Sequence, residues 1–338
     1  MSYTNQESFH VRMDVMKTIE HRIDEFIERY LSPVEKNWQP SDLLPDTNSE
    51  EFFSVFHEIR EQAKELCYDF WVTLVGDTVT EEALPTYESW LMDVTGIDQN
   101  EDGQGNGWAK WVRKWTSEEN RHGDVLNKFL YLSGRVNMRE VEVTTQHLIA
   151  DGFDIGTDRD PYKNFVYTSF QELATNISHK RVGKLASDKG NDMLAKICKI
   201  VAGDEMRHYL AYREFVKVIF EYDPNEMMMA YFDMMKKKIV MPAHFIRESG
   251  EGIGTAYVDF SNSAQRLGVY TNLDYIDIII KLNKYWDLES ITDLNDDGEK
   301  ARDYLLALPR RLSRLADRYK SPTYHHTFRW VYKNGVMA

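Results

Sequence analysis

Apolar residues recur every three to four positions along most of the chain, which is the spacing of amphipathic helices. This spacing predicts helices near residues 11–31, 50–66, 69–94, 107–132, 138–150, 161–187, 191–221, 224–247, 255–267, 272–284 and 297–318. Pro85 falls inside the third of these and cannot donate a backbone hydrogen bond to the carbonyl of Glu81, so we expect a kink there. No β-rich segment of any length appears. The pattern therefore predicts an all-α protein.

Two of the predicted helices have a gap in their apolar stripe, and the same short motif fills both gaps. The motif is an acidic residue followed by Glu-x-Arg-His. Its spacing puts Glu119 and His122 on one helix face, and Glu205 and His208 on another. Both pairs occupy positions where Leu or Ile is expected. A buried carboxylate beside a buried imidazole is costly unless the two are paired or bind metal. One such pair is compatible with a core ion pair, but two matching motifs indicate a metal site.

A helical site for two metals needs two further carboxylates, one from each of two other helices. Glu172 is the only acid in the helix predicted before the second motif. Before the first motif, Glu81 shares a face with apolar positions, but Glu82 and Glu88 compete and spacing alone separates the three poorly. Two divalent cations would cancel four carboxylates that repulsion and burial would otherwise protonate. Oxygen and imidazole ligands suit iron or manganese, and the absence of thiolates argues against structural zinc.

Longer strings around these positions resemble the soluble acyl-carrier-protein (ACP) desaturases, a family best known from plant plastids, and the resemblance covers nearly the whole chain. The strings are PVEK at 33–36, LVGD at 74–77, EEALPTY at 81–87, LYLSGRV at 130–136, YTSFQE at 167–172, MPAH at 241–244 and QRLGVY at 265–270. They are more specific than Glu-x-x-His, which many di-iron bundles carry. The resemblance implies a ferritin-like four-helix bundle with a di-iron centre, extended by additional helices.

The resemblance also implies roles for individual residues. The family's iron ligands correspond to Glu81, Glu119, His122, Glu172, Glu205 and His208, which selects Glu81 over Glu82. Thr175 matches a family threonine on the oxygen-binding side, although bonding back to its own helix carbonyls is an equal alternative. Asp204 and Trp38 match a pair thought to carry electrons to His122, and Asp204 is also suited to orienting a metal-bound histidine.

Two positions depart from the plant pattern in a way that bears on the acyl pocket. Trp90 stands where methionine is usual, and Asn164 stands where glycine is usual. Both residues are bulkier than those they replace. We therefore predict a shorter pocket and a preference for an acyl chain shorter than stearoyl.

The activity implied is insertion of a cis double bond, expected at Δ9, into an ACP-bound saturated acyl chain. The implied cofactor is two irons, the oxidant is O2, ferredoxin supplies two electrons, and the enzyme is a homodimer. Two other functions use a similar ligand set. Iron storage or ferroxidase action, as in ferritins, needs no acyl tunnel, and ferritin chains are much shorter. A di-iron hydroxylase of small hydrocarbons would yield an alcohol in place of an alkene.

Charge and composition narrow the partners. The 338 residues carry a net charge of −14, which argues against nucleic acid. An acidic carrier protein then needs a local basic patch, for which the candidates are Lys236, Lys237 and Lys238 together with Arg310, Arg311, Arg314 and Arg318. Either group is equally well explained as a solvated helix face.

Other features of the sequence concern domains and location. No Pro/Gly/Ser-rich linker divides the chain, so we expect a single helical domain over residues 1–338. No stretch approaches the roughly 20 apolar residues of a membrane span. Cys67 and Cys198 are the only cysteines, which suits a reducing compartment. The polar amino-terminal segment predicts a cytoplasmic protein, or one in the plastid stroma if a transit peptide has been removed.

Overall fold

The computed structural model describes residues 3–97, 106–318, 323 and 325–332. Its α-helices are α1 (Tyr3–Glu20), α2 (Ile23–Tyr30), α3 (Phe52–Ala63), α4 (Tyr68–Glu82), α5 (Leu84–Met92), α6 (Gly107–Ser133), α7 (Met138–Asp151), α8 (Pro161–Asp188), α9 (Asp192–Tyr222), α10 (Pro224–Lys237), α11 (Tyr257–Leu267), α12 (Asn272–Tyr285) and α13 (Asp296–Ala316). Short 3-10 turns cover Val34–Lys36, Pro40–Asp42, Pro242–Phe245 and Leu288–Ser290. Within the described ranges the sole β feature is one isolated bridge between Val136 and Val331, so the all-α prediction is confirmed.

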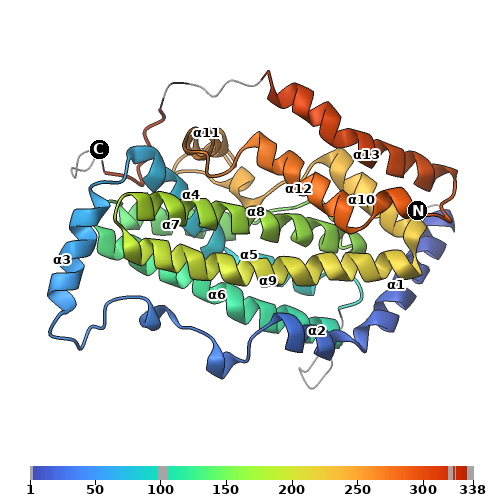
Figure 1. The fold of residues 1–338 in the computed structure, drawn as a ribbon, viewed down its shortest axis with the longest axis horizontal. Coiled ribbons are helices and arrows are strands. Elements are labelled where there is room, and N and C mark those ends of the chain that lie inside the picture. Colours follow the sequence, from blue (N-terminus) through green and yellow to red (C-terminus); the bar gives the residue numbers. More distant parts are fainter. Residues whose placement is uncertain (1–2, 98–105, 319–322, 324, 333–338) are drawn as a thin grey trace.

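Four helices, α4, α6, α8 and α9, form the centre of the molecule. The helices α8 and α9 run side by side along its long axis (Figure 1) and pack on each other, and α4 packs on α6. The helices α10 to α13 cover the side formed by α4 and α8. One hydrophobic cluster continues through all these elements. The expected four-helix bundle with added helices is therefore present, whereas the assignment of the whole chain to one domain stays a prediction.

Three predicted helices differ from the structure at identifiable residues. The helix expected over 69–94 breaks after Glu82, and Pro85 lies in the first turn of α5, where a missing backbone N–H does no harm. The kink expected beside Glu81 is thus confirmed. The helix expected over 11–31 is divided between α1 and α2. The one expected over 224–247 ends at Lys237, because Lys238 adopts a φ of 68°.

Side-chain caps fix where three of the central helices begin. Asn106 accepts a hydrogen bond from the backbone N–H of Ala109 at the start of α6, at 3.0 Å. Asp160 caps α8 in the same way, and Asn191 caps α9. Each cap of this kind stabilises its helix by about 1 kcal/mol.

In the part of the chain that the structure describes, no helix is both apolar and long enough to pass through a lipid bilayer.

Alanine in place of Gly76 is expected to destabilise the protein by about 1–3 kcal/mol, because a Cβ atom there would overlap the ring of Phe260 where α4 meets α11. Gly203→Ala is the control. This glycine is exposed on α9, and a Cβ atom there meets nothing within 4 Å. Loss of a helical glycine should stabilise the control by roughly 0.5–1 kcal/mol. Urea unfolding of both variants checks the prediction, and a Gly76→Ala variant as stable as the parent would contradict it.

Candidate metal centre

All six residues expected as ligands point into the space between the four central helices. They are Glu81 from α4, Glu119 and His122 from α6, Glu172 from α8, and Glu205 and His208 from α9. They form two groups of four whose ligand atoms lie within 4.8 Å of one another. Glu119 and Glu205 belong to both groups, with Glu81 and His122 completing one and Glu172 and His208 completing the other. In a two-metal centre, Glu119 and Glu205 would therefore be shared by both ions.

The hydrogen bonding of the two histidines leaves one nitrogen of each free for a metal. The Nε2 atom of His122 lies 3.3 Å from the Asp204 carboxylate, and that of His208 lies 2.9 Å from the Glu118 carboxylate. A carboxylate takes the imidazole proton on its side, so Nδ1 keeps its lone pair and faces the centre. Both Nδ1 atoms are buried and make no hydrogen bond of ordinary geometry, and the same holds for the Oε1 atoms of Glu119 and Glu205. Nδ1 of His208 nevertheless lies 2.5 Å from Oε1 of Glu119, and Nδ1 of His122 lies 3.2 Å from Oε1 of Glu205. Nitrogen and oxygen lone pairs that face one another at these distances fit binding of two divalent cations.

The electrostatics of the cluster also favour bound cations. The pKa of Glu172 is raised well above its usual range, first by burial and then by the neighbouring Glu119 carboxylate. The pKa of Glu81 is likewise raised, mainly by burial. Burial opposes ionisation of Glu119 too, but His122 and His208 outweigh it and lower the pKa of this carboxyl. Burial and mutual repulsion therefore oppose ionisation of Glu81 and Glu172, which agrees with the need for neutralisation inferred from the sequence.

Glu118 is part of the centre, although the sequence interpretation gave it no role. Its carboxylate accepts hydrogen bonds from Arg207 at 2.9 Å and from the backbone N–H of Ser32 at 2.6 Å. The same carboxylate forms the hydrogen bond to Nε2 of His208. Asp204 stands in the same relation to His122 and also binds Arg121 at 2.9 Å. The motif itself carried this signal, because an acid precedes the ligand glutamate in both copies. Each acid orients the histidine of the opposite copy.

Trp115 was also missed as a functional residue, having been counted as part of the apolar stripe. Its indole Nε1 donates a 2.9 Å hydrogen bond to Glu172. The side chain is nearly fully buried on α6, one turn before Glu119. It therefore holds a carboxylate that belongs to one of the two ligand groups.

The predicted accessory residues lie where the sequence suggested. Trp38 donates from Nε1 to Asp204 at 2.9 Å, and its ring stacks on His122 with centroids 6.2 Å apart. The Thr175 hydroxyl contacts Glu205 and also bonds back to the carbonyl of Glu172 at 3.1 Å. The alternative of bonding back to its own helix is therefore present, whereas a role of Thr175 on the oxygen-binding side stays a prediction.

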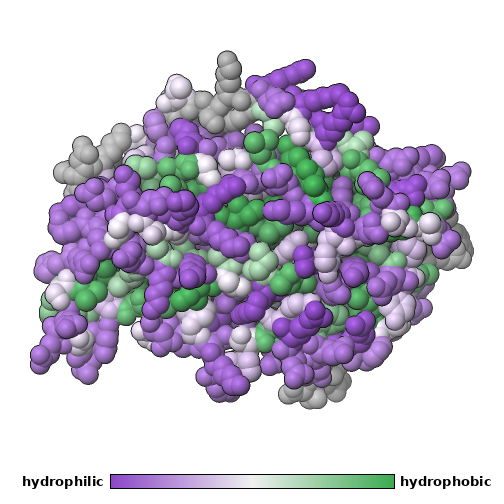
Figure 2. Space-filling model, in the orientation of Figure 1, coloured by the Kyte–Doolittle hydropathy of each residue, from purple (hydrophilic) through white to green (hydrophobic). Residues whose placement is uncertain are grey.

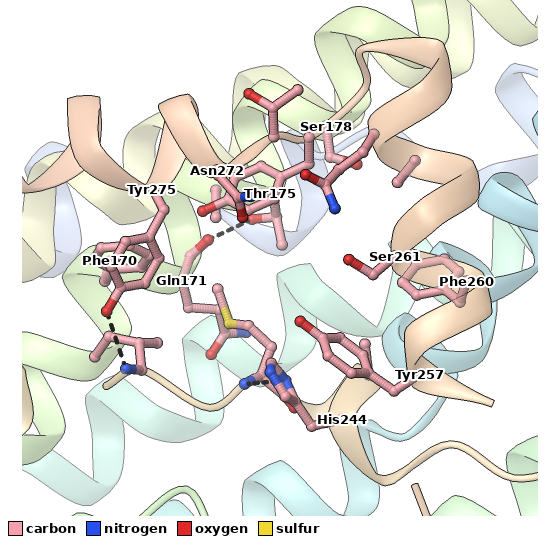
Figure 3. A pocket seen from close by; sticks show the side chains of 18 of the residues that line it. Phe170, Gln171, Thr175, Ser178, His244, Tyr257, Phe260, Ser261, Asn272 and Tyr275 are labelled. Atoms are coloured by element: carbon pink, nitrogen blue, oxygen red, sulfur yellow. Dashed lines mark hydrogen bonds between the residues drawn. The ribbon is translucent and has the colours of Figure 1, made fainter. Parts of the chain in front are cut away.

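An apolar cavity of about 560 Å³ lies beside the centre. Phe170, Gln171 and Thr175 of α8 face it from one side, and His244, Tyr257 and Phe260 face it from the other (Figure 3). Ligand pockets in proteins occupy roughly 300–1,000 Å³. None of the six candidate ligands lines this cavity, but Thr175 lines it and contacts Glu205, so the cavity wall and the metal centre share this one side chain.

Apolar surface is exposed around the same region. It appears where α11, α12 and α13 lie, on a face that is otherwise mostly hydrophilic (Figure 2). Leu273 of α12 and Leu315 of α13 are exposed there, and Leu315 also lines the cavity. These helices thus join the cavity to the surface.

The residues predicted to dock the carrier and to shape the acyl pocket differ in whether they line this cavity. Lys238 lines it, and Lys236 and Lys237 are exposed at the adjoining end of α10. Trp90 lies half-buried on α5, and Asn164 lies buried in the first turn of α8, but neither belongs to the cavity wall. The cavity therefore gives no support to a shorter acyl pocket, which stays a prediction.

A helical bundle that buries four carboxylates and two imidazoles between its helices belongs to the class of carboxylate-bridged two-metal proteins. The sequence family described as fatty acid desaturase matches residues 11–332. The chain therefore belongs to the fatty acid desaturases, in the acyl-ACP branch, and is an oxidoreductase.

Individual relatives agree with this assignment. The chain is 45% identical to the chloroplastic stearoyl-ACP 9-desaturase 5 of Arabidopsis thaliana over 331 residues, which cover 97% of this chain and 83% of the relative. It is 44% identical to the palmitoyl-ACP 4-desaturase 3 of Ophrys sphegodes, covering 96% and 82%. Among solved structures, Mycobacterium tuberculosis DesA2, described as an acyl-ACP desaturase, matches with a TM-score of 0.51 at 15% identity over 86% of this chain and 99% of that one. This last likeness concerns the fold alone.

Proposed function

We propose that this enzyme introduces a cis double bond, expected at Δ9, into a saturated acyl chain carried by ACP. The observation that carries the proposal is the apolar cavity lined by Thr175, whose hydroxyl contacts Glu205, a carboxylate shared by both ligand groups. A methylene chain entering from the surface would be guided along apolar walls to the metal ligands. Relatives described as 9- and 4-desaturases support the reaction type. Because these relatives differ in the position of the double bond, the Δ9 position is part of the proposal.

The substrate explains why such a centre is needed. Methylene C–H bonds have no useful acidity, so the general bases of the chain cannot remove their hydrogens. Two irons would supply the oxidising chemistry when bound. The overall reaction consumes O2, two electrons and two protons, and it yields one alkene and two waters. The protein's own part is to hold the chain in a dry cavity and to fix the carboxylates through Trp115 and the histidines through Asp204 and Glu118.

An external protein must provide the electrons, and we propose ferredoxin. Trp38 is half-buried, stacks on His122 and donates to Asp204, which in turn meets His122. These contacts support a route from the surface to the centre. The resemblance to the family also predicts a homodimer, in which the partner is a second copy of this chain. The location, in the cytoplasm or in the plastid stroma, likewise stays a prediction.

We propose that the carrier docks at the surface end of the cavity. Lys236, Lys237 and Lys238 approach it from α10, and Arg311 and Arg314 are exposed on α13 beside the cavity-lining Leu312 and Leu315. Two basic groups far apart in the sequence therefore flank one opening. Lys237 is partly neutralised by Asp158 at 2.8 Å. The arrangement supplies the local positive charge that an acidic carrier needs on a chain with a net charge of −14.

The two alternatives make different predictions for the purified protein. A ferritin-like store would assemble into a cage, whereas the proposed enzyme is expected to have the native size of a homodimer. A hydroxylase would release an alcohol. The cavity beside Thr175 favours the desaturase over an iron store, because storage of iron needs no apolar channel to the ligands.

Turnover after anaerobic iron loading tests the proposal. Palmitoyl-ACP and stearoyl-ACP are supplied with reduced ferredoxin and O2, and the products are read by mass spectrometry. We expect an alkene from both and faster turnover of the palmitoyl substrate, because Trp90 and Asn164 are bulky. Trp90→Met with Asn164→Gly is the matched variant and should shift the preference towards stearoyl. A parent enzyme that prefers stearoyl-ACP would remove the shorter-pocket prediction, and an alcohol product would remove the desaturase assignment.

A further inference from the structure

The two outer carboxylates of the centre are not held in the same way. Glu172 receives its hydrogen bond from Trp115, which lies four residues before the bridging Glu119 on α6. The corresponding position on α9, four residues before Glu205, is Val201. Valine has no polar atom in its side chain. The second copy of the motif therefore cannot supply Glu81 with the bond that the first copy supplies to Glu172.

The donor to Glu81 comes instead from α8. His179 lies two turns beyond Glu172, is 1% exposed, and places Nε2 3.0 Å from Oε1 of Glu81. The other oxygen of Glu81, Oε2, lies 3.8 Å from Nδ1 of His122 and faces the ligand group that these residues share. One oxygen is thus tied to the imidazole while the other is turned towards the place of an ion.

The surroundings of His179 set which ring nitrogen carries the proton. Its Nδ1 atom is buried and makes no hydrogen bond of ordinary geometry, and besides the Glu81 carboxylate the ring interacts with the thiol of Cys198 on α9. Gly183 allows this approach, because a Cβ atom at that position would lie only 3.0 Å from the Cβ atom of Cys198. A thiol is a weak acceptor and a weak donor, whereas the carboxylate of Glu81 is a strong acceptor. The proton of a neutral His179 therefore belongs on Nε2.

We propose that His179 is the positioning residue of Glu81 and that it makes the two metal positions chemically unequal. An imidazole orients the carboxylate on the side of His122, and an indole orients the carboxylate on the side of His208. Cys198, which the sequence interpretation assigned to the core, assists because its thiol is too weak an acceptor to compete with Glu81 for the proton of His179. This inference rests on the proposed two-metal centre and adds a difference between its halves.

Titration with Co(II), used as a spectroscopic probe, tests the proposal on the full chain after removal of its metals under anaerobic conditions. The parent is expected to bind two equivalents with two resolved affinities. His179→Phe removes the donor to Glu81 and should weaken one binding step by about 10- to 100-fold, the usual cost of losing the partner of a metal ligand. Trp115→Phe is the matched control, because it removes the donor to Glu172 and should weaken the other step. The double variant should weaken both.

A variant that restores the hydrogen bond to Glu81 distinguishes a positioning role of His179 from a role in packing alone. In His179→Gln the side-chain amide can still donate to Glu81, so most of the lost affinity and the parent cobalt spectrum should return. If His179→Phe does not fold, His179→Leu takes its place, with thermal unfolding of the metal-free protein as the check on folding. Two unchanged binding steps in the apolar variant, or loss of the same step in the His179 and Trp115 variants, would overturn this inference alone. A parent protein that binds no Co(II) would overturn the metal centre itself.

Discussion

Glutamine in place of Glu205 is expected to abolish desaturation and to remove high-affinity binding of both metal ions. Glu205 belongs to both ligand groups, is 2% exposed, and presents a buried Oε1 atom that has no hydrogen-bond partner. An amide cannot supply the negative charge that helps to neutralise two cations. The loss of metal affinity should therefore exceed the roughly 10- to 100-fold typical of a residue that acts through a ligand.

The Glu205→Gln variant should still fold, so that a loss of metal binding can be assigned to the missing carboxylate. Loss of one charge from a cluster of four carboxylates lowers their mutual repulsion in the metal-free protein. Elemental analysis, Co(II) titration and turnover of acyl-ACP measure the effect, with thermal unfolding as the check on folding. Glu221→Gln, at an exposed acid on the same helix, is the control and should match the parent. Two tightly bound ions in the Glu205 variant would show that this carboxylate is not a bridging ligand.

The sequence predicted the fold and the placing of the six candidate ligands for a physical reason. Charged residues in an apolar stripe are rare, so the two Glu-x-Arg-His motifs were conspicuous against it. Family resemblance then separated Glu81 from Glu82, which share a helix end and differ only in direction. The structure turns Glu81 towards His122, whereas Glu82 accepts a hydrogen bond from Asn127 at 2.9 Å. Periodicity alone could not choose between neighbours beside a kink.

The supporting residues were harder to predict because their signals resemble ordinary packing. Trp115 and Cys198 both lie on apolar stripes. A sequence alone does not distinguish a tryptophan or cysteine that only packs there from one whose N–H or thiol also contacts a polar side chain. His179 gives no local signal, since its partner Glu81 is 98 residues away in the sequence. The end of α10 at Lys237 shows the same limit, because it depends on the backbone of Lys238, which does not interrupt the apolar spacing. At Glu82, by contrast, Pro85 allowed the kink to be predicted.

Phenylalanine in place of Ala174 is expected to block the acyl chain and leave the metal centre intact. Ala174 lies on α8 between Gln171 and Thr175 along the cavity wall and is 5% exposed. A phenyl ring there has open space to enter, so its stability cost should stay below the about 1–3 kcal/mol of overpacking in a filled core. Displacement of the substrate by even about 1 Å can lower the rate by roughly 100-fold, and a filled cavity should lower kcat/KM by at least that much.

Two measurements on the Ala174 variant distinguish a blocked cavity from a damaged centre. Two equivalents of Co(II) should bind with the parent spectrum, because Ala174 is not among the ligands, while turnover of palmitoyl- and stearoyl-ACP falls together. Ala174→Ser, which adds little volume, should keep most of the activity. Full activity in the Ala174→Phe variant would mean that the acyl chain reaches the metals by another path. Because iron storage needs no cavity, ferroxidase turnover in the absence of acyl-ACP should be unchanged, so the same variant separates the two functions that this ligand set could serve.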